Sequence, residues 1–392
     1  MHSVLLLVIV VVAATAFDFT NGFHDTANVV ASSISTRALA PRTAITLVSV
    51  LNFVGAFISL KVAATIATGI IDAGQVTETI AFAGLIGAIA WNLITWAYGL
   101  PSSSSHALIG GMIGAMLAGA GAGGVKFGGL LTMVVIPALV APLAAFAVAG
   151  GVIAVVYRVL GRRSPGPVTR TFRAGQIVSN SALALAHGTN DAQKTMGVIT
   201  LALVAHGSLS PEHASVPAWV VVLSATAISL GTYAGGWRII RTVGSRIIRM
   251  DSAQAFSAQA SGAFVILFSS HLGYPLSSTH VISGGVIGAG AAKRLSAVRW
   301  GVAGAIAGAW AITLPTAALF GAGAYAVASA FGHGALGPLI IAVLAIGGPL
   351  SMTLAARRRR VSDPAWAASA RGADQVVPIS RPSASARGDW PA

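Results

Sequence analysis

The sequence contains no cysteine and very few charged residues. The absence of thiols excludes disulfide bonds and thiol redox chemistry. Charged residues make up 9% of the 392 positions and hydrophobic residues 55%, whereas a typical soluble domain carries about 25% charged residues. Together with a mean hydropathy of +0.81, this composition predicts an all-α, polytopic integral membrane protein.

Acidic residues are scarcer than basic ones, with 10 Asp and Glu against 24 Lys and Arg, for a net charge of +14. Such a balance can indicate nucleic-acid binding, but most arginines lie in short clusters between apolar segments, which is typical of cytoplasmic anchors of membrane helices. We therefore expect a lipid bilayer as partner and no nucleic acid. The clusters assigned to the cytoplasm are Arg37 and Arg42; Arg158, Arg162, Arg163, Arg170 and Arg173; Arg238 to Arg249; Lys293, Arg294 and Arg299; and Arg357 to Arg360. The acidic residues assigned to loops on the opposite side are Asp72, Glu78 and Glu212.

Apolar segments alternate with these clusters. They lie at residues 3–35, 43–70, 79–98, 105–122, 128–158, 174–205, 216–236, 253–270, 278–292, 299–330 and 336–356. Most approach the roughly 20 residues that span a bilayer, whereas 105–122, 253–270 and 278–292 are short enough to be re-entrant. The first lacks a basic leader and a cleavage site, so we expect a retained helix, with the N-terminus outside. Segment 128–158 contains two prolines, which predict a tilt or kink.

Polar stretches interrupt two of the apolar segments. Residues 22–28 read Gly-Phe-His-Asp-Thr-Ala-Asn, and residues 187–194 read His-Gly-Thr-Asn-Asp-Ala-Gln-Lys; Asp25 aligns with Asp191 at an offset of 166. Ionisable groups at membrane depth cost a few kcal/mol each and are usually functional. Breaks in corresponding segments of two halves point to a transporter's binding site, so we expect unwound backbone at both stretches.

A second pair of motifs recurs in the same order. Residues 101–106 (Pro-Ser-Ser-Ser-Ser-His) match residues 275–280 (Pro-Leu-Ser-Ser-Thr-His) at an offset of 174, and each is followed by Gly-Gly-x-x-Gly. The charge clusters place the first motif on the cytoplasmic side and the second outside. The pattern predicts an inverted-repeat secondary transporter with about 10–12 transmembrane or re-entrant segments and broken helices at the midplane. The expected parts are a first repeat (1–160), a cytoplasmic linker (161–173), a second, inverted repeat (174–330), an extra transmembrane helix (336–356) and a disordered basic cytoplasmic tail (357–392).

Each serine run has the pattern of a helix start. The first N–H groups of a helix lack partners and its dipole makes that end positive, so it binds oxyanions, and hydroxyl groups add donors. Two such ends from opposite sides would hold one central anion. Ordinary N-capping is the structural alternative for each run.

The aspartates suit a cation rather than the anion. Asp25 and Asp191 would repel an oxyanion, so we expect them to hold Na⁺ or H⁺ beside it, completed by unwound backbone carbonyls and the amides of Asn28 or Asn190. The structural alternative is a buried ion pair of Asp191 with Lys194. That lysine could instead touch the substrate. The four motif histidines, His24, His106, His187 and His280, could relay protons or bind a metal, but no dense metal-ligand spacing appears and hydrogen-bonded structural roles fit as well.

Taken together, these motifs resemble those of a known family. Residues 18–28, with Ser-Thr-Arg-Ala-Leu at 35–39, resemble the first signature of the inorganic phosphate transporter (PiT) family, and residues 187–197 resemble the second. The two Ser-His segments and residues 236–244 are similar too, and the resemblance extends to about residue 356. Much of the family reads Gly-Ala-Asn-Asp where this chain has Gly22-Phe23-His24-Asp25, as bacterial low-affinity members do. That departure leaves the coupling ion open.

The resemblance implies secondary active transport of inorganic phosphate driven by H⁺ or Na⁺, with phosphate between short hairpins of both halves. The implied phosphate ligands are Ser103, Ser104, Ser105, Ser277, Ser278, Thr279, Asn28, Thr189, Asn190 and Lys194. The expected coupling-ion residues are Asp25, Asp191 and Asp18, the last of which could instead face a water-filled vestibule. We expect no cofactor and no resident metal, although bacterial members are associated with neutral metal–phosphate complexes, so a divalent metal could travel with phosphate.

We therefore interpret the chain as a multi-pass cell-membrane symporter for phosphate that works by alternating access, and not as an enzyme. Two alternatives remain from the sequence. One is transport of another oxyanion, such as sulfate or arsenate. The other is a membrane-embedded serine hydrolase, which the absence of a strand-turn nucleophile elbow disfavours. The sequence is compatible with a homodimer and does not decide it.

Overall fold

The computed structural model describes residues 4–160, 164–210, 215–236, 239–240, 247–248, 250–332 and 334–343. These residues form helices joined by short loops, with one isolated β-bridge between Ile71 and Val125. The helical architecture confirms the predicted fold class, because a helix satisfies its backbone groups internally, as a bilayer requires. Residues 336–343 are helical. The rest of the expected last transmembrane helix and the tail lie outside the described residues.

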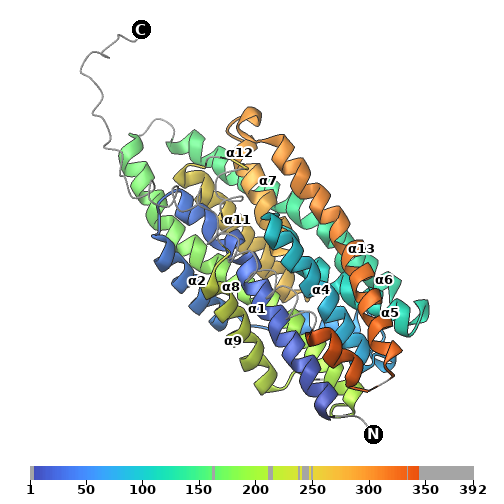
Figure 1. Cartoon of the computed structure of the whole chain (residues 1–392). Helices are drawn as coiled ribbons and strands as arrows, with labels where there is room; N and C mark the ends of the chain where they lie inside the picture. The colour runs from blue at the N-terminus through green and yellow to red at the C-terminus, as the bar shows by residue number, and fades with distance from the viewer. Residues whose placement is uncertain are drawn as a thin grey trace, which may run out of the picture. The chain divides into compact units, whose positions relative to one another are not determined.

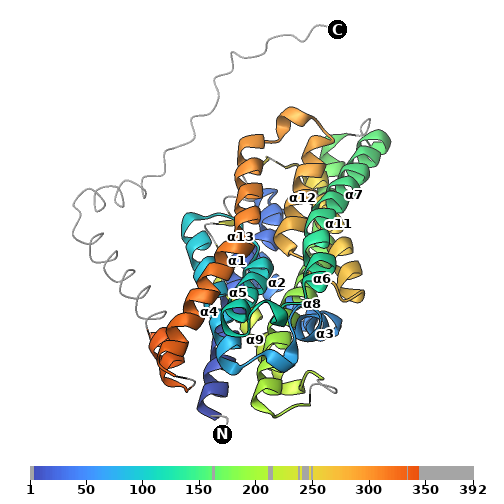
Figure 2. The same ribbon diagram turned by 90° about the vertical axis from the view of Figure 1, so that its right-hand side faces the viewer.

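The α-helices carry the architecture (Figures 1 and 2). They are α1 (Val4–Ser35), α2 (Pro41–Gly55), α3 (Lys61–Thr68), α4 (Glu78–Tyr98), α5 (Ser104–Gly119), α6 (Phe127–Leu130), α7 (Ile136–Leu160), α8 (Pro165–His206), α9 (Ala218–Ala234), α11 (Ser252–His271), α12 (Ser278–Ala291) and α13 (Trp300–Ala330). Short 3₁₀ turns lie at η1 (Ala73–Gln75), η2 (Ala122–Gly124) and η6 (Leu295–Ala297), and a π-helical turn lies at η3 (Leu131–Val135). Four stretches are long and apolar enough to cross a membrane: Val4–Ser35, Glu78–Tyr98, Phe127–Leu160 and Trp300–Ala330.

Three helix boundaries differ from the expected segments. The segment expected at 43–70 is divided, because α2 ends at Gly55 and α3 begins only at Lys61. The expected linker is largely helical, since α8 begins at Pro165, and a proline in the first turn suits a helix start. In segment 128–158 a π-helical turn ends two residues before Pro137, whereas Pro142 lies inside α7. A proline lacks the N–H that would continue the regular ladder.

Both polar signatures are helical, so the expectation of unwound backbone was wrong at these positions. Helix α1 continues without a break through residues 22–28, and α8 continues through residues 187–194. The helix breaks lie beside the signatures instead, between α2 and α3 and in the loops before α5 and α12. The polar side chains find partners on neighbouring helices, so the backbone keeps its own hydrogen bonds.

Two helical hairpins point toward each other. The outer ends of α4 and α5 lie together, because the N–H of Asp72 donates to the carbonyl of Gly124. The outer ends of α11 and α12 likewise lie together, because Lys293 Nζ is 3.0 Å from Asp251 Oδ2. The inner tips meet, with Ser105 Oγ donating to the Leu276 carbonyl at 3.2 Å. The two serine motifs therefore lie side by side in the interior, so the two helix starts converge as expected. The side of the membrane that each hairpin enters from stays a prediction.

Glycines at matching positions allow helices to approach closely. A Cβ on Gly22 would lie 2.4 Å from the Ile228 carbonyl oxygen of α9, and a Cβ on Gly188 would lie 2.2 Å from the Asn52 carbonyl oxygen of α2. Helices α1 and α8 thus pack on α9 and α2 by the same small-residue device. At the α2–α9 contact, Ser49 and Ser229 exchange side-chain-to-carbonyl hydrogen bonds of 2.7 and 2.9 Å.

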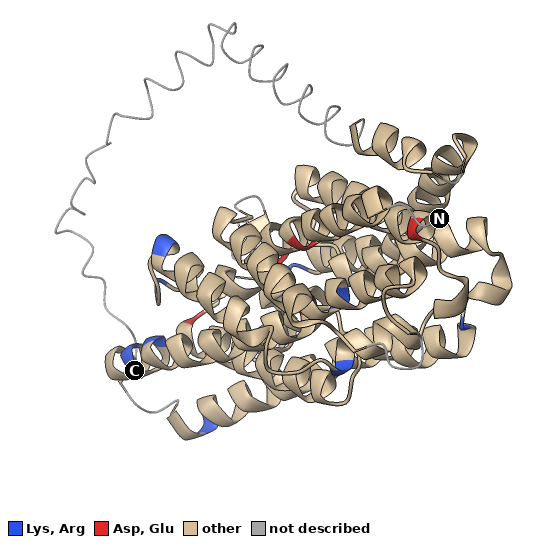
Figure 3. Ribbon diagram, turned by 90° about the horizontal axis from the view of Figure 1, so that it is seen from below, with Lys and Arg blue, Asp and Glu red and all other residues tan. Residues whose placement is uncertain are grey.

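Basic positions are unevenly distributed along the helices. Figure 3 shows most of the basic positions toward one end of the helices. A cavity of about 330 Å³ at that end is lined in part by Arg37, Arg173 and Asp251. The opposite end carries Asp72 and a partly buried contact in which His206 Nδ1 is 2.7 Å from Glu78 Oε1. Arg37 and Arg173, which belong to two of the predicted cytoplasmic clusters, therefore lie at the same end of the helices. Arg162 and Arg163, the arginines at 238–249 and 357–360, and the acidic Glu212 lie outside the described residues.

Candidate functional site

The two signatures converge where α1 and α8 pass the hairpin tips. Ligand atoms of Asp25, His187 and Asp191 all lie within 4.8 Å of one another. Asp25 is 1% exposed, and His187 and Asp191 are fully buried. The offset of 166 residues between the aspartates therefore predicted a real spatial pair, although the two come from helices far apart in the sequence.

Asp191 is surrounded by donors. The ammonium of Lys194 pairs with Asp191 Oδ1, to which the Asn190 amide also donates at 2.7 Å. On the other oxygen, His187 Nε2 lies at 2.9 Å and Ser278 Oγ donates at 3.0 Å. The buried ion pair considered from the sequence is thus present, and it shares its carboxylate with the tip of the second hairpin.

Lys194 joins both hairpin tips. Its Nζ is 2.5 Å from Ser105 Oγ in the first turn of α5. It is also 2.8 Å from the Leu276 carbonyl, in the loop before α12. The same carbonyl accepts the Asn190 amide at 2.8 Å, while the Leu276 N–H donates back to Asn190 Oδ1 at 3.2 Å. Lys194 has one of the largest fully buried side chains among the described residues. Its charge is therefore held where the two helix N-termini meet.

Asp25 has a matching but less charged environment. Its Oδ1 accepts from Asn28 Nδ2 and Thr279 Oγ1, both at 3.2 Å, and lies 3.0 Å from His24 Nδ1. Asn28 also donates to Thr279 Oγ1 at 2.8 Å. Asn28 occupies the position that Lys194 holds in the other signature, so one carboxylate faces an amide where its counterpart faces an ammonium.

Asp18 lies two helical turns before Asp25 on α1 and is fully buried. Its Oδ1 accepts a hydrogen bond of 2.7 Å from Thr195 Oγ1. Its Oδ2 and the side-chain oxygen of Asn21 are buried without a hydrogen-bond partner in the described part of the chain. Buried acceptors of this kind need a donor or a cation, so they are suited to proton or cation binding. Asp18 does not face an open vestibule.

The serine motifs divide into capping and facing residues. Ser103 Oγ accepts from the His106 N–H at 3.1 Å, and Ser277 Oγ accepts from the His280 N–H at 3.3 Å. These two serines are N-caps of α5 and α12, as the structural alternative proposed. The next residues face the signatures: Ser105, Ser278 and Thr279 contact the lysine or the aspartates. Ser104 Oγ is buried and has no partner among the described residues.

Thr189 lies apart from this cluster. Its hydroxyl donates to the carbonyls of Gly55 on α2 and Leu185 on its own helix, both at 2.8 Å. The side chain thus holds α8 against α2 rather than reaching the hairpin tips. Of the ten residues expected to contact the anion, Thr189 is the one whose side chain bonds to α2 instead of to the hairpin tips or the aspartates.

Sequence reasoning missed several contributors. The Leu276 carbonyl accepts three side chains, Thr195 holds Asp18, and Thr95 Oγ1 lies 3.1 Å from His24 Nε2. A backbone carbonyl has no sequence signal. The threonines lie in apolar helices, where a single hydroxyl usually bonds to its own backbone.

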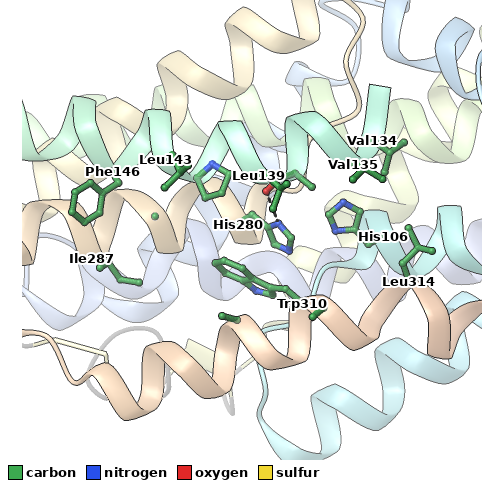
Figure 4. A pocket seen from close by; sticks show the side chains of 15 residues that line it. His106, Val134, Val135, Leu139, Leu143, Phe146, His280, Ile287, Trp310 and Leu314 are labelled. Carbon is green, nitrogen blue, oxygen red and sulfur yellow. Dashed lines mark hydrogen bonds between the residues drawn. The ribbon is translucent and has the colours of Figure 1, made fainter. Parts of the chain in front are cut away.

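The histidines of the two serine motifs meet beside the site. The rings of His106 and His280 have centroids 4.7 Å apart, and His280 stacks on Trp310 at 4.0 Å. They line one wall of a cavity of about 510 Å³ that is otherwise apolar, between α7, α12 and α13 (Figure 4). Side chains such as Leu139 and Phe146 face it. An apolar lining does not compensate the charge of an oxyanion, so this cavity does not extend the anion site.

Comparisons with known proteins show what the chain is similar to. A family model described as the phosphate transporter family matches residues 21–167 and 161–321. A protein of Mycobacterium bovis named "Probable low-affinity inorganic phosphate transporter" is 54% identical over 320 residues, covering 82% of this chain and 77% of that protein. A protein of the same name from Rhizobium meliloti is 47% identical, covering 82% and 96%. A solved structure titled "The sodium-dependent phosphate transporter" is similar with a TM-score of 0.75 and 25% identity, covering 82% of this chain and 98% of that one.

Proposed function

Since this chain belongs to the phosphate transporter family, we propose that it is a symporter that imports inorganic phosphate with H⁺ or Na⁺ by alternating access. Phosphate transport, a location in the membrane and the absence of enzymatic activity follow from the family and its relatives. The coupling ion, the binding residues and the direction of transport belong to the proposal. The observation that carries it is the meeting of two helix N-termini beside paired aspartates.

Phosphate would bind between the starts of α5 and α12. Besides the capped His106 and His280 N–H groups, each helix start has N–H groups without a partner in the helix, and its dipole end is positive. Hydroxyl donors follow directly, from Ser104 and Ser105 on one side and Ser278 and Thr279 on the other. Lys194 would add one full positive charge. Several of these groups now bond to each other, so phosphate would take over their hydrogen bonds.

The charge of the site argues for coupling. When ionised, Asp18, Asp25 and Asp191 carry three negative charges against one positive charge of Lys194. At about 4 Å, two like charges repel by about 4 kcal/mol in a medium of intermediate dielectric constant. Bound H⁺ or Na⁺ would remove this repulsion, so the cation would bind before phosphate or with it. The cluster of Asp25, His187 and Asp191 could also accept a divalent ion carried with phosphate.

We place the basic end, with Arg37 and Arg173, in the cytoplasm by the positive-inside rule. The recurring motifs and the opposed hairpins support two inverted repeats, over residues 1–160 and 174–330. Because α8 begins at Pro165, the connection between them is shorter than the expected 161–173. Rocking of one repeat against the other would open the site to either side. The cytoplasmic position of residues 357–392 remains a prediction.

Radiolabelled phosphate uptake into proteoliposomes tests the proposal, with an imposed pH gradient or an imposed Na⁺ gradient. We expect one gradient to drive uptake by the wild type, and Asp191→Asn to abolish it. Asp72→Asn is the matched control: the same substitution in an exposed loop should leave uptake unchanged. Uptake that ignores both gradients would refute coupling.

Substrate choice is tested in the same vesicles. Excess arsenate should compete with phosphate, because its size and charge are similar, whereas sulfate should compete weakly. Stronger competition by sulfate would reassign the substrate. Repeating uptake with Mg²⁺ or with a chelator tests whether a divalent metal accompanies phosphate, since a metal–phosphate substrate would lose uptake in the chelator.

A further inference from the structure

A network of neutral polar side chains lies between the site and the basic end of the helices. Gln259 of α11 donates to Ser32 and Ser33 of α1, at 2.8 and 2.6 Å, and to Asn180 of α8 at 3.2 Å. Ser179 donates to Gln259 Oε1 at 2.9 Å. All five side chains are at most 5% exposed. Ser32 is one helical turn beyond Asn28, so the network begins where the site ends.

The network continues to the end of the helices. Thr36 Oγ1 donates to Gln176 Oε1 at 2.7 Å, and Gln176 Nε2 donates to the Ser252 carbonyl at 3.2 Å. Thr36 and Ser252 also line the 330 Å³ cavity with Arg37 and Arg173. The two groups of neutral side chains are joined through the Ser32 and Gln176 carbonyls, which accept from Thr36 and Ser179. They thus lie between the buried site and a cavity lined by two arginines and Asp251.

The region between the site and the opposite end of the helices has a different lining. Applying the offset of 166 to α1 and α8, and 174 to the hairpins, gives the counterpart of each network position. The hairpin offset holds in three dimensions, because Gly111 approaches Gly84 as Gly285 approaches Ala258. The counterparts of Ser32, Ser33, Thr36, Gln176, Ser179, Asn180 and Gln259 are Val198, Ile199, Ala202, Val10, Ala13, Ala14 and Leu85. All seven counterparts are apolar and belong to one buried core.

The hydrogen bonding of the network is incomplete. Gln259 Nε2 has three acceptors within reach but only two hydrogens. Asn180 Nδ2 is buried without a partner among the described residues. A network that serves only to hold helices together would be expected to satisfy its buried groups. Groups with unused donors exchange partners easily, with water or with an anion.

We propose that this network is the closed cytoplasmic passage for phosphate, and that Gln259, Asn180 and the two serines contact phosphate as it leaves. The inference rests on the proposed transport function. Neutral donors can replace the water around an anion without trapping it, as a fixed positive charge would, or repelling it, as a carboxylate would. The apolar core on the opposite side closes the other exit by excluding water.

Cysteine labelling tests the passage, because the natural chain has no cysteine that could react in the background. The variants are Asn180→Cys in the network and its counterpart Ala14→Cys in the apolar core. A membrane-impermeant thiol reagent is applied to one face at a time, with and without phosphate and the driving gradient. Phosphate uptake is measured in the same vesicles.

We expect Asn180→Cys to react from the basic face during phosphate turnover, about tenfold faster than without phosphate, and Ala14→Cys not to react from that face. If Asn180→Cys transports phosphate but stays unlabelled, or reacts only from the opposite face, the passage is refuted. Absence of uptake in the wild type would instead refute the transport proposal.

Gln259→Leu copies the apolar counterpart and provides a second test. We expect the maximal uptake rate to fall about tenfold, the effect of one or two lost hydrogen bonds, with the half-saturating phosphate concentration nearly unchanged. Gln259→Asn should restore part of the rate. A lower melting temperature with unchanged uptake per folded molecule would show a purely structural network and refute the passage.

Discussion

Replacing Lys194 tests how the centre of the site is held together. Lys194→Met keeps the length and apolar stem of the side chain and removes the charge. It deletes the pair with Asp191 and the contacts with Ser105 and the Leu276 carbonyl. That carbonyl still accepts from Asn190 and Ser105. The main loss is therefore the charge that balances the fully buried Asp191.

The size of the effect follows from burial. Removing one partner of a buried ion pair costs about 3–5 kcal/mol, because the other charge is left without compensation. Asp191 keeps donors from Asn190 and Ser278 and its contact with His187, so we expect the lower end of that range. An exposed ion pair would lose at most about 1 kcal/mol. The two cases are clearly separated.

Thermal unfolding of the purified protein measures this loss. About 3 kcal/mol corresponds to a fall in Tm of roughly 4 °C, because an unfolding entropy of about 2.1 cal/mol/K per residue sums to about 0.8 kcal/mol/K over 392 residues. Lys61→Met is the matched control, because Lys61 is exposed and its Nζ contacts only the His271 carbonyl at 2.9 Å among the bonds described. We expect that control to change stability by less than about 0.5 kcal/mol.

The double variant Asp191→Asn/Lys194→Met completes the cycle. Because both charges are gone, it should be more stable than the sum of the single losses predicts, by about 2 kcal/mol. Equal stability of Lys194→Met and the Lys61→Met control, or additive losses in the double variant, would refute the ion-pair reasoning. Uptake that returns in the double variant would assign the lysine to neutralising Asp191, and uptake that stays absent would assign it to phosphate.

Three further predictions concern stability. Gly188→Ala should lower the free energy of unfolding by about 1–3 kcal/mol, because its Cβ would lie 2.2 Å from a carbonyl oxygen; an unchanged Tm would contradict the close packing. Ser103→Ala should cost about 1 kcal/mol through loss of the cap of α5, measured by denaturant titration, and an equal loss in Ser104→Ala would contradict the capping assignment. For Asp251, burial raises the pKa, but hydrogen bonds from the Gln254 N–H and two side chains outweigh it and lower the pKa. Its contribution should therefore be present above the ordinary aspartate pKa of about 4 and lost as the pH falls through the lowered pKa of the folded state, so that Asp251→Asn lowers Tm more at pH 7 than at pH 3.

Much of this protein was readable from residue type and spacing. The scarcity of charge and the long apolar segments determined an all-helical membrane protein, because a bilayer leaves the backbone no other partner. The recurrence of the Asp25 motif at Asp191, and of one serine motif at the other, located the candidate site. The first residues of α5 and α12 were predicted to within one position, because serine caps act through local hydrogen bonds.

Other features depend on contacts that no local pattern encodes. The signatures stay helical because Asn190 and Asp191 find partners on the opposite hairpin, and hydropathy alone could not distinguish that from an unwound break. The meeting of the hairpin tips was expected from the paired serine motifs, but their contact through the Leu276 carbonyl was not. The sequence determined which groups the site contains, through composition and recurrence. Only the tertiary structure decided which of them face one another, because that depends on helix packing across more than a hundred residues of chain.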